Sequence, residues 1–145
     1  MTARLSLLLL GAGVLAAPAA LHAQNWSPPS RQMPAMPERA GMQGGGASAA
    51  GPWLGSMAGA AGVGAGDVRA AGEGGGARAK FVRFTSGVFP VATWTDRNGD
   101  GKCDMVEVFR DGNRIYQLVD ADFDGAANVL RVYDNSGELL REERL

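Results

Sequence analysis

The sequence predicts a mostly β protein, with a long disordered N-terminal part followed by a small antiparallel unit of repeated β-hairpins with acidic loops. Three observations predict this class. Nearly all large apolar residues outside the N-terminus lie within residues 81–145. Of the 22 glycines, 14 lie between Ala40 and Lys80, where they raise the entropic cost of ordering and offer little side chain to bury. The segment 81–145 also repeats with a period of 24 residues.

Residues 1–23 are predicted to be an export signal. The start is short and basic, an apolar run covers residues 5–17, and Ala23 is a small residue suited to cleavage. This run is too short to cross a bilayer as a helix, so a retained membrane anchor is the less favoured interpretation. The chain is therefore expected to be exported, to the periplasm or outside the cell, and not to span a membrane.

Residues 24–80 are predicted to be a disordered linker that serves as a flexible tether. The first part is rich in Pro and Met, which favours extended polyproline-like chain, and the second part is rich in Gly and Ala. The thioethers of Met33 and Met36 suit Cu(I), but no His or Cys lies nearby to complete such a site. We therefore interpret both methionines as incidental.

The domain 81–145 is predicted to consist of short strands. Residues 81–94 contain Gly87 and Pro90 among Val and Thr residues, which suits strands better than a helix. Residues 81–95 are expected to add a third packing layer to two hairpins. These hairpins join 105–110 to 114–119 through the turn Asp111-Gly112-Asn113, and 127–133 to 138–145 through Asn135-Ser136-Gly137.

The 24-residue period aligns Asp96 with Asp120. Each unit then reads as an Asp/Asn-rich loop, an alternating apolar run and a tight polar turn. Internal periods of this size indicate stacked supersecondary units. The residues Asp96, Asn98, Asp100, Gly101, Asp104, Val106, Val108, Phe109 and Asp111 align in turn with Asp120, Asp122, Asp124, Gly125, Asn128, Leu130, Val132, Tyr133 and Asn135.

Residues 96–107 match a calcium-binding loop at each ligand position. A hard cation such as Ca²⁺ takes about six to eight oxygens from carboxylates, amides, carbonyls and water. Alternating side chains curl round the ion, Gly101 permits the sharp turn, and a final carboxylate closes the sphere. The alternative is a metal-free turn with solvated aspartates, but so many carboxylates would repel one another without a cation. The predicted ligands are Asp96, Asn98, Asp100, the carbonyl of Lys102, Asp104 and Glu107.

Residues 120–131 form a second, incomplete version of this loop. The final ligand position holds Arg131, which donates hydrogen bonds and never ligates a cation. The loop is expected either to bind metal weakly with extra water or to have its aspartates neutralised by Arg131, and Phe123 is interpreted as a packing residue. The predicted ligands are Asp120, Asp122, Asp124, the carbonyl of Ala126, and Asn128.

The pattern Asp-x-Asn-x-Asp-Gly-x-x-Asp at residues 96–104 resembles the calcium loop of the EF-hand superfamily. It is most similar to the loops of exported bacterial and extracellular relatives, namely dockerin modules and thrombospondin type 3 repeats. The resemblance implies Ca²⁺ as the cation of both loops. Gly87 and Pro90 before the first loop, and Asp111-Gly112 after it, leave no room for the two helices of an EF-hand proper. We therefore expect EF-hand-like loops between strands.

Scarce residue types and charge narrow the chemistry further. His22 is the only histidine and lies in the predicted signal, and Cys103 is the only cysteine. The exported chain then has no imidazole base, no catalytic Ser-His or Cys-His pair and no thiolate metal cage, so Cys103 is interpreted as a small buried hydrophobe. Residues 81–145 carry 12 Asp and Glu against 8 Arg and Lys, which argues against nucleic acid as a partner.

The sequence therefore predicts an exported, non-enzymatic module in which Ca²⁺ stabilises a core too small to stand alone. The alternative is a surface interaction or adhesion module whose loops are metal-free turns. Residues at exposed edges, such as Phe84 and Trp94, would then contact another exported or cell-surface protein. A hydrolase that pairs Asp100 with Glu107 is less favoured, because such a small domain leaves little room for a substrate pocket.

Overall fold

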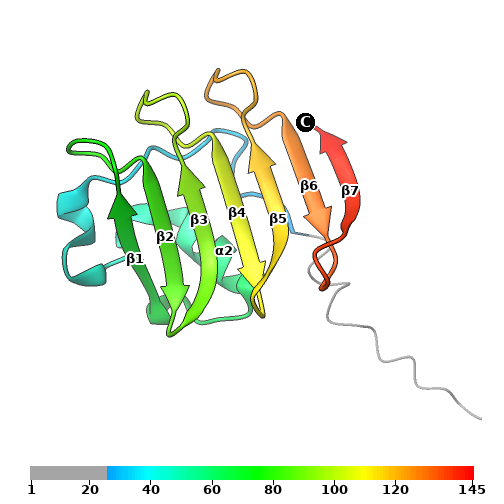
Figure 1. The fold of residues 1–145 in the computed structure, drawn as a ribbon, viewed down its shortest axis with the longest axis horizontal. Helices are drawn as coiled ribbons and strands as arrows, with labels where there is room; N and C mark the ends of the chain where they lie inside the picture. Colours follow the sequence, from blue (N-terminus) through cyan, green and yellow to red (C-terminus); the bar gives the residue numbers. More distant parts are fainter. Residues whose placement is uncertain (1–25) are drawn as a thin grey trace, which may run out of the picture.

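The computed structural model describes residues 26–145, so the predicted export signal lies outside the described residues. One antiparallel sheet of seven strands, paired in sequence order, forms the body of the protein (Figure 1). The mostly β class is confirmed, and β2 to β7 lie where strands are expected. The strands are β1 (Val68–Glu73), β2 (Phe81–Ser86), β3 (Phe89–Thr95), β4 (Met105–Arg110), β5 (Asn113–Val119), β6 (Val129–Tyr133) and β7 (Leu139–Arg144).

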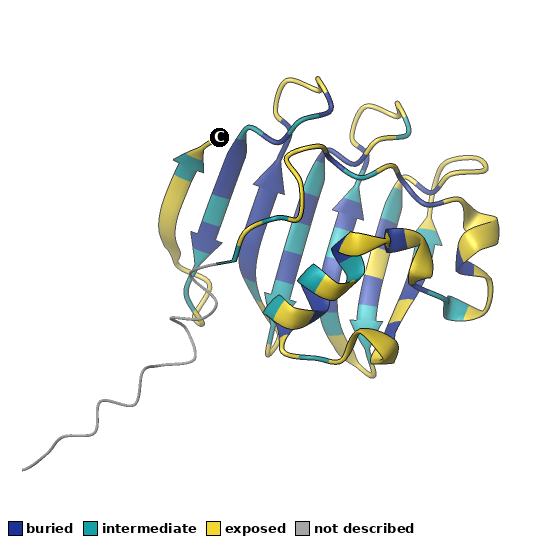
Figure 2. Cartoon of the chain, turned by 180° about the vertical axis from the view of Figure 1, so that it is seen from behind, coloured by how far each residue is buried: buried dark blue, intermediate teal, exposed yellow. Residues whose placement is uncertain are grey.

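A helical layer covers one face of this sheet and leaves the other face open (Figure 2). Its main element is α2 (Pro52–Ala61), which begins with Pro52 in the first turn and ends at Gly62, where φ is 76°. Proline suits the start of a helix and glycine suits a left-handed cap. The 3₁₀ helices η1 (Arg39–Gly45), η2 (Ser48–Ala50) and η3 (Ala65–Asp67) complete the layer. None of the helices in residues 26–145 is long and apolar enough to cross a membrane.

The expectation of a disordered linker is wrong for residues 26–80, which fold onto the sheet. Glycine and alanine are abundant there, but a few large side chains, among them Met42, Trp53 and Met57, are buried against the sheet. The small residues allow this close approach. A Cβ built on Gly72 would lie 2.6 Å from the Met42 Cε atom and 2.8 Å from the Ala79 Cβ atom. The foldable unit is therefore larger than residues 81–145.

Trp94 lies at the centre of the core between sheet and helix. Its ring meets Trp53 edge-on at a centroid distance of 6.2 Å and Phe84 at 5.1 Å, and its Nε1–H donates to Met57 Sδ at 3.1 Å. The description of Phe84 and Trp94 as exposed-edge residues is thus wrong, because both side chains are fully buried. Residues 81–95 likewise form no separate layer, since β2 and β3 pair within the same sheet.

An extended segment, residues 31–39, crosses the ends of the strands and is called the strap. Isolated bridges join Gln32 to Ala126, Ala35 to Lys102 and Glu38 to Arg78. Each step of three residues forward along the strap moves the partner 24 residues back along the chain of the sheet. A polyproline-like chain advances about 9 Å in three residues, and two strand spacings cover about 9.5 Å. The strap therefore matches the sheet repeat by its length per residue.

Candidate metal centre

Three loops lie side by side at one end of the sheet (Figure 1). Loop A is residues 74–80 between β1 and β2, loop B is 96–104 between β3 and β4, and loop C is 120–128 between β5 and β6. Backbone hydrogen bonds tie neighbouring loops together, from Asp96 N–H to the Lys80 carbonyl and from Asp120 N–H to the Asp104 carbonyl, both at 2.8 Å. The loops B and C contain the predicted ligands.

Loop B brings three of its predicted ligands together. Carboxylate oxygens of Asp96, Asp100 and Asp104 lie within 4.8 Å of one another. Both oxygens of Asp96 accept backbone hydrogen bonds, from Gly99 N–H at 2.7 Å and from Gly101 N–H at 2.9 Å. Gly101 adopts a φ of 84°, a left-handed conformation that glycine tolerates and that curls the chain round Asp96.

Asp104 is the least satisfied member of this cluster. Its side chain is 1% exposed, and its Oδ2 atom accepts hydrogen bonds from Arg97 N–H at 2.6 Å and Asn98 N–H at 3.3 Å. Its Oδ1 atom is buried without a hydrogen-bond partner. Burial raises the pKa of Asp104, and the nearby Asp100 and Asp96 carboxylates raise it further. A cation at the cluster would supply the missing partner for this carboxylate.

Two further predicted ligands of loop B, Asn98 and Lys102, are hydrogen-bonded to Asp100. The Asn98 amide donates to Asp100 Oδ2 at 3.3 Å, which keeps Asn98 at the edge of the cluster. Lys102 N–H donates to Asp100 Oδ1 at 2.9 Å, and Lys102 forms the bridge to Ala35 of the strap. Both residues therefore contact the Asp100 carboxylate of the cluster.

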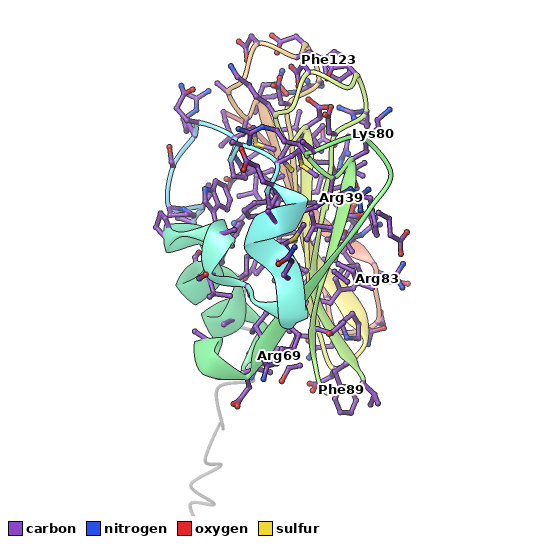
Figure 3. The ribbon with its side chains drawn as sticks, turned by 90° about the vertical axis from the view of Figure 1, so that its left-hand side faces the viewer. Arg39, Arg69, Lys80, Arg83, Phe89 and Phe123 are labelled. Carbon is purple, nitrogen blue, oxygen red and sulfur yellow. The ribbon has the colours of Figure 1, made fainter. Side chains whose placement is uncertain are left out.

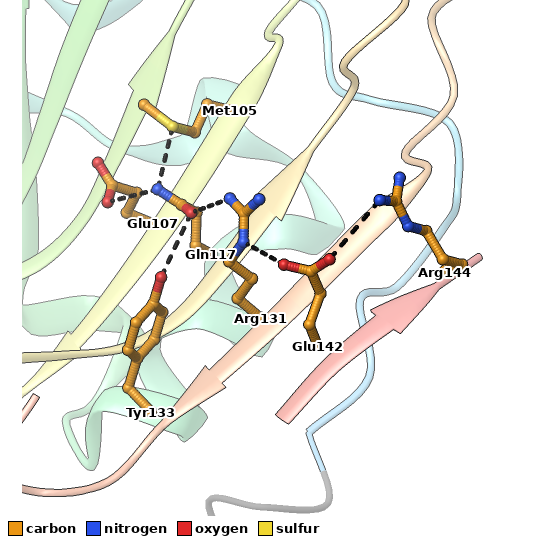
Figure 4. Close-up of polar contacts among 7 residues, drawn as sticks. All are labelled: Met105, Glu107, Gln117, Arg131, Tyr133, Glu142 and Arg144. Atoms are coloured by element: carbon orange, nitrogen blue, oxygen red, sulfur yellow. Dashed lines mark hydrogen bonds and ion pairs between the residues drawn. The ribbon is translucent and has the colours of Figure 1, made fainter. Parts of the chain in front are cut away.

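Glu107, predicted as the closing ligand, is not brought to loop B. On the open face of the sheet its Oε2 atom accepts a hydrogen bond from Arg114 Nη1 at 2.7 Å. It accepts a second one from Gln117 Nε2 at 3.2 Å (Figure 4). The reason is that β4 begins at Met105, directly after the loop. The two-residue period of a strand then sends Glu107 to the polar face. We correct the ligand set accordingly.

Loop C repeats this arrangement, but two of its three aspartates are exposed, whereas loop B has only one exposed aspartate. Carboxylate oxygens of Asp120, Asp122 and Asp124 lie within 4.8 Å of one another, and Asp120 is 1% exposed. Asp120 accepts hydrogen bonds from Asp124 N–H at 3.3 Å and Gly125 N–H at 2.8 Å. A hydrogen bond shared with Asp120 raises the pKa of Asp122, as does the charge of Asp124. The carboxylates are thus crowded here too.

The last two predicted ligands of loop C make backbone contacts within the loop. Asn128 Oδ1 accepts a hydrogen bond from Ala121 N–H at 3.0 Å. Ala126 N–H donates to Asp124 Oδ1 at 2.8 Å. The Asn128 amide therefore closes the loop on its own backbone, as the Asp104 carboxylate does in loop B.

Arg131 does not neutralise loop C. It donates to Glu142 Oε2 and to Gln117 Oε1, both at 2.8 Å, on the open face of the sheet (Figure 4). Phe123 is 41% exposed, and the Arg97 guanidinium lies 5.0 Å from its ring centroid. Arg97 also donates to the Asp120 carbonyl at 2.9 Å, so it links loop B to loop C.

Loop A contains no acidic residue and is held by a guanidinium instead. Arg39, at the end of the strap, donates through Nε to the Gly76 carbonyl at 2.9 Å, through Nη1 to Gly72 at 3.3 Å and through Nη2 to Gly74. Figure 3 shows Arg39 in the half of the molecule that lies toward the loops. Sequence reasoning missed this role because Arg39 precedes the loop by some 35 residues.

Within residues 26–145, the carboxylates of the acidic loops are not paired with a basic side chain, although Arg97 donates to the Asp120 carbonyl and the Lys102 ammonium lies beside Gly125 of loop C. Among the residues that the structure describes, the ion pairs lie elsewhere and none includes an aspartate of loop B or loop C. In loop A a guanidinium therefore meets the loop carbonyls, while the carboxylates of loops B and C gather without an ion-pair partner among the described residues.

Comparison with known proteins assigns no family to this chain. No protein-family model, no curated protein and no solved structure matches it.

Cys103 lies in loop B next to the cluster and offers a test by pH. Burial raises its pKa to about 12, whereas an unfolded cysteine has a pKa of about 8.5. Its contribution to stability is therefore complete below about pH 8.5 and is lost as the pH rises toward 12. The equivalent positions in loops A and C, Ala79 and Ala127, are also buried, so Cys103→Ala should fit without strain.

We expect the melting temperature of the wild-type protein to fall more steeply with pH than that of Cys103→Ala, over the range from about pH 8.5 to about pH 10.5. Thermal melts of the two proteins across this range check the expectation. Parallel curves would show that the Cys103 thiol ionises as easily in the folded state as in the unfolded chain.

Proposed function

We propose that this protein is an exported module that binds Ca²⁺ in loop B, and more weakly in loop C, and that the cation stabilises the loop end of its sheet. The observation that carries the proposal is the buried Asp104 Oδ1 atom, which has no partner although its carboxylate belongs to a cluster of three. A buried carboxylate oxygen without a partner is costly, and a bound cation removes that cost.

The chemistry of the donors supports Ca²⁺ over softer metals. The side chains gathered in loop B offer only oxygen, as carboxylates or as an amide, and hard cations prefer such ligands. Without Glu107 the protein supplies fewer oxygens than an EF-hand loop, and water would complete the sphere. We therefore expect an affinity in the range of extracellular modules, with a Kd of about 10⁻⁴ M. Millimolar Ca²⁺ would then add about 1.4 kcal/mol to the stability.

Loop A supports the same proposal as an internal comparison. It occupies the same end of the sheet, and the carbonyls of Gly72, Gly74 and Gly76 receive the Arg39 guanidinium. A positive group thus stabilises the one loop that lacks carboxylates. The carboxylates of loops B and C form no ion pair among the described residues, and their cation would come from solution. The interaction alternative named Phe84 and Trp94, whose burial removes them from any contact surface.

A calcium titration of the Asp100→Ala variant tests the proposal. Asp100 is exposed, so its removal should leave the core intact while it withdraws one carboxylate from the loop B cluster. We expect saturable heat for the wild-type protein and a loss of affinity of about tenfold or more at the loop B site of the variant, measured by isothermal calorimetry.

Asp67→Ala is the matched control, because it removes the same charge at the end of β1 that lies away from the loops. Its calcium titration should equal that of the wild-type protein. A wild-type protein that gives no heat and melts at the same temperature in Ca²⁺ and in chelator would refute the proposal.

A further inference from the structure

The backbone hydrogen bonds of the strap go to the loops and not to the strands, while the side chains of Met33 and Met36 are buried in the core. Arg78 Nη1 of loop A also donates to the Met36 carbonyl at 2.7 Å. At each of the three loops it makes one pair of backbone hydrogen bonds, with one strap carbonyl as acceptor and one strap N–H as donor. The pairs are Ala127 N–H to Arg31 O (2.7 Å) with Met33 N–H to Gly125 O (2.9 Å), Cys103 N–H to Pro34 O (2.9 Å) with Met36 N–H to Gly101 O (2.9 Å), and Ala79 N–H to Pro37 O (3.2 Å) with Arg39 N–H to Ala77 O (2.9 Å).

The glycine that receives the strap in each acidic loop is also bonded to an aspartate. Gly101 donates its N–H to Asp96 Oδ2 at 2.9 Å and accepts from Met36 N–H through its carbonyl. Gly125 donates to Asp120 Oδ2 at 2.8 Å and accepts from Met33 in the same way. A displacement of either aspartate therefore displaces the carbonyl on which the strap is held.

Loop A differs because its cation belongs to the strap. The Arg39 side chain donates to loop carbonyls while the Arg39 N–H donates to Ala77 O, so docking of residue 39 supplies both the backbone bond and the positive charge. Nothing outside the chain is needed to close this loop. Its state should not depend on a metal ion.

Resting on the proposed function, we propose that Ca²⁺ in loops B and C controls the docking of residues 31–36 of the strap. With the cation bound, Asp96 and Asp120 keep the positions that hold Gly101 and Gly125. Without it, repulsion within each carboxylate cluster opens the loop, and the strap loses the acceptors of Met33 and Met36. Residues 31–36 then leave the sheet while Arg39 stays docked. Calcium thereby governs how far along the chain the N-terminal segment is free.

Residue-resolved amide hydrogen exchange of the full-length chain, measured by NMR in Ca²⁺ and in chelator, tests this coupling. At a free Ca²⁺ concentration of about ten times Kd, the amides of Met33 and Met36 should exchange about tenfold more slowly than in chelator. The amide of Arg39 should exchange at the same rate in both conditions. It serves as the internal control, because loop A needs no external cation.

A pair of buried methionines tests the coupling from the opposite direction. By linkage, a change that loosens the strap must weaken Ca²⁺ binding by the factor with which Ca²⁺ protects the strap. Met36→Ala should therefore lower calcium affinity. Met57→Ala, which truncates an equally buried side chain in α2, should not.

The outcomes separate the coupling from the proposed function. Saturable calcium heat with unchanged exchange at Met33 and Met36 would overturn the coupling and leave calcium binding intact. Equal slowing at Met33, Met36 and Arg39 would also overturn it, because the cation would then stabilise the whole fold and not the strap in particular. The absence of both calcium heat and any change in exchange would overturn the two proposals together.

Discussion

Replacing Asp104 with asparagine should raise the stability in chelator and remove the further stabilisation that calcium gives at loop B. The substitution removes a buried negative charge from a cluster that already holds the Asp96 and Asp100 carboxylates. The asparagine oxygen keeps the hydrogen bonds from the Arg97 and Asn98 amides, and its NH₂ group gains neighbouring carboxylates as acceptors. In chelator, Asp104→Asn should therefore be more stable than the wild-type protein, by about 1–3 kcal/mol.

The two proteins should also respond differently to calcium. The wild-type melting temperature should rise on adding Ca²⁺. Asp104→Asn should lose the part of this rise that comes from loop B, since a charged ligand is gone. Thermal melts of both proteins in the two conditions provide the measurement. Asp104→Ala is a useful companion, because it leaves the Arg97 and Asn98 amides unpaired and should be destabilised even in chelator. An asparagine variant that loses stability in chelator would mean that the Asp104 charge is already compensated.

Truncation of Trp94 should cost more stability than any other single change considered for this protein. Trp94 is fully buried, packs against Trp53 and Phe84, and bonds to the sulfur of Met57. Trp94→Ala should lower the free energy of unfolding by about 3–5 kcal/mol. That is a large part of the total for a small domain, which is about 5–15 kcal/mol.

Urea denaturation followed by circular dichroism measures this loss. Phe89→Ala is the control, because Phe89 is 60% exposed at the end of the sheet opposite the loops (Figure 3), and its truncation should change stability by less than about 0.5 kcal/mol. Equal effects of the two substitutions would mean that α2 does not pack on the sheet in solution.

The difference between Trp94 and Phe89 also illustrates why part of the fold was beyond sequence reasoning. An alternating strand has two faces, and its pattern does not say which face another element covers. That choice depends on α2, whose few large residues lie in a segment rich in Gly and Ala. Trp53 and Met57 do stand four residues apart, the spacing of one helix face, and this was the available signal for a helix.

In the candidate metal centre, too, one part of the prediction is confirmed and another is wrong. Asp96, Asp100 and Asp104 come together because hydrogen bonds to residues close in sequence, such as Gly99 and Gly101, shape the loop. Glu107 lies beyond the start of β4, where the period of the strand replaces that of the loop. A pattern that counts ligand positions through both regions assumes one backbone geometry where there are two.

The strands from Phe81 onward, the tight turns between them and the two clusters of aspartates could be predicted before the structure, since each depends on alternation or on bonds between near neighbours. Three features are visible only in the folded chain: the segment before Phe81 folds, Arg39 fills loop A, and a three-residue step along the strap matches a 24-residue step along the sheet. These features depend on groups far apart in the chain. Their fit arises from the spacing of paired strands, a distance that exists only once the sheet has formed.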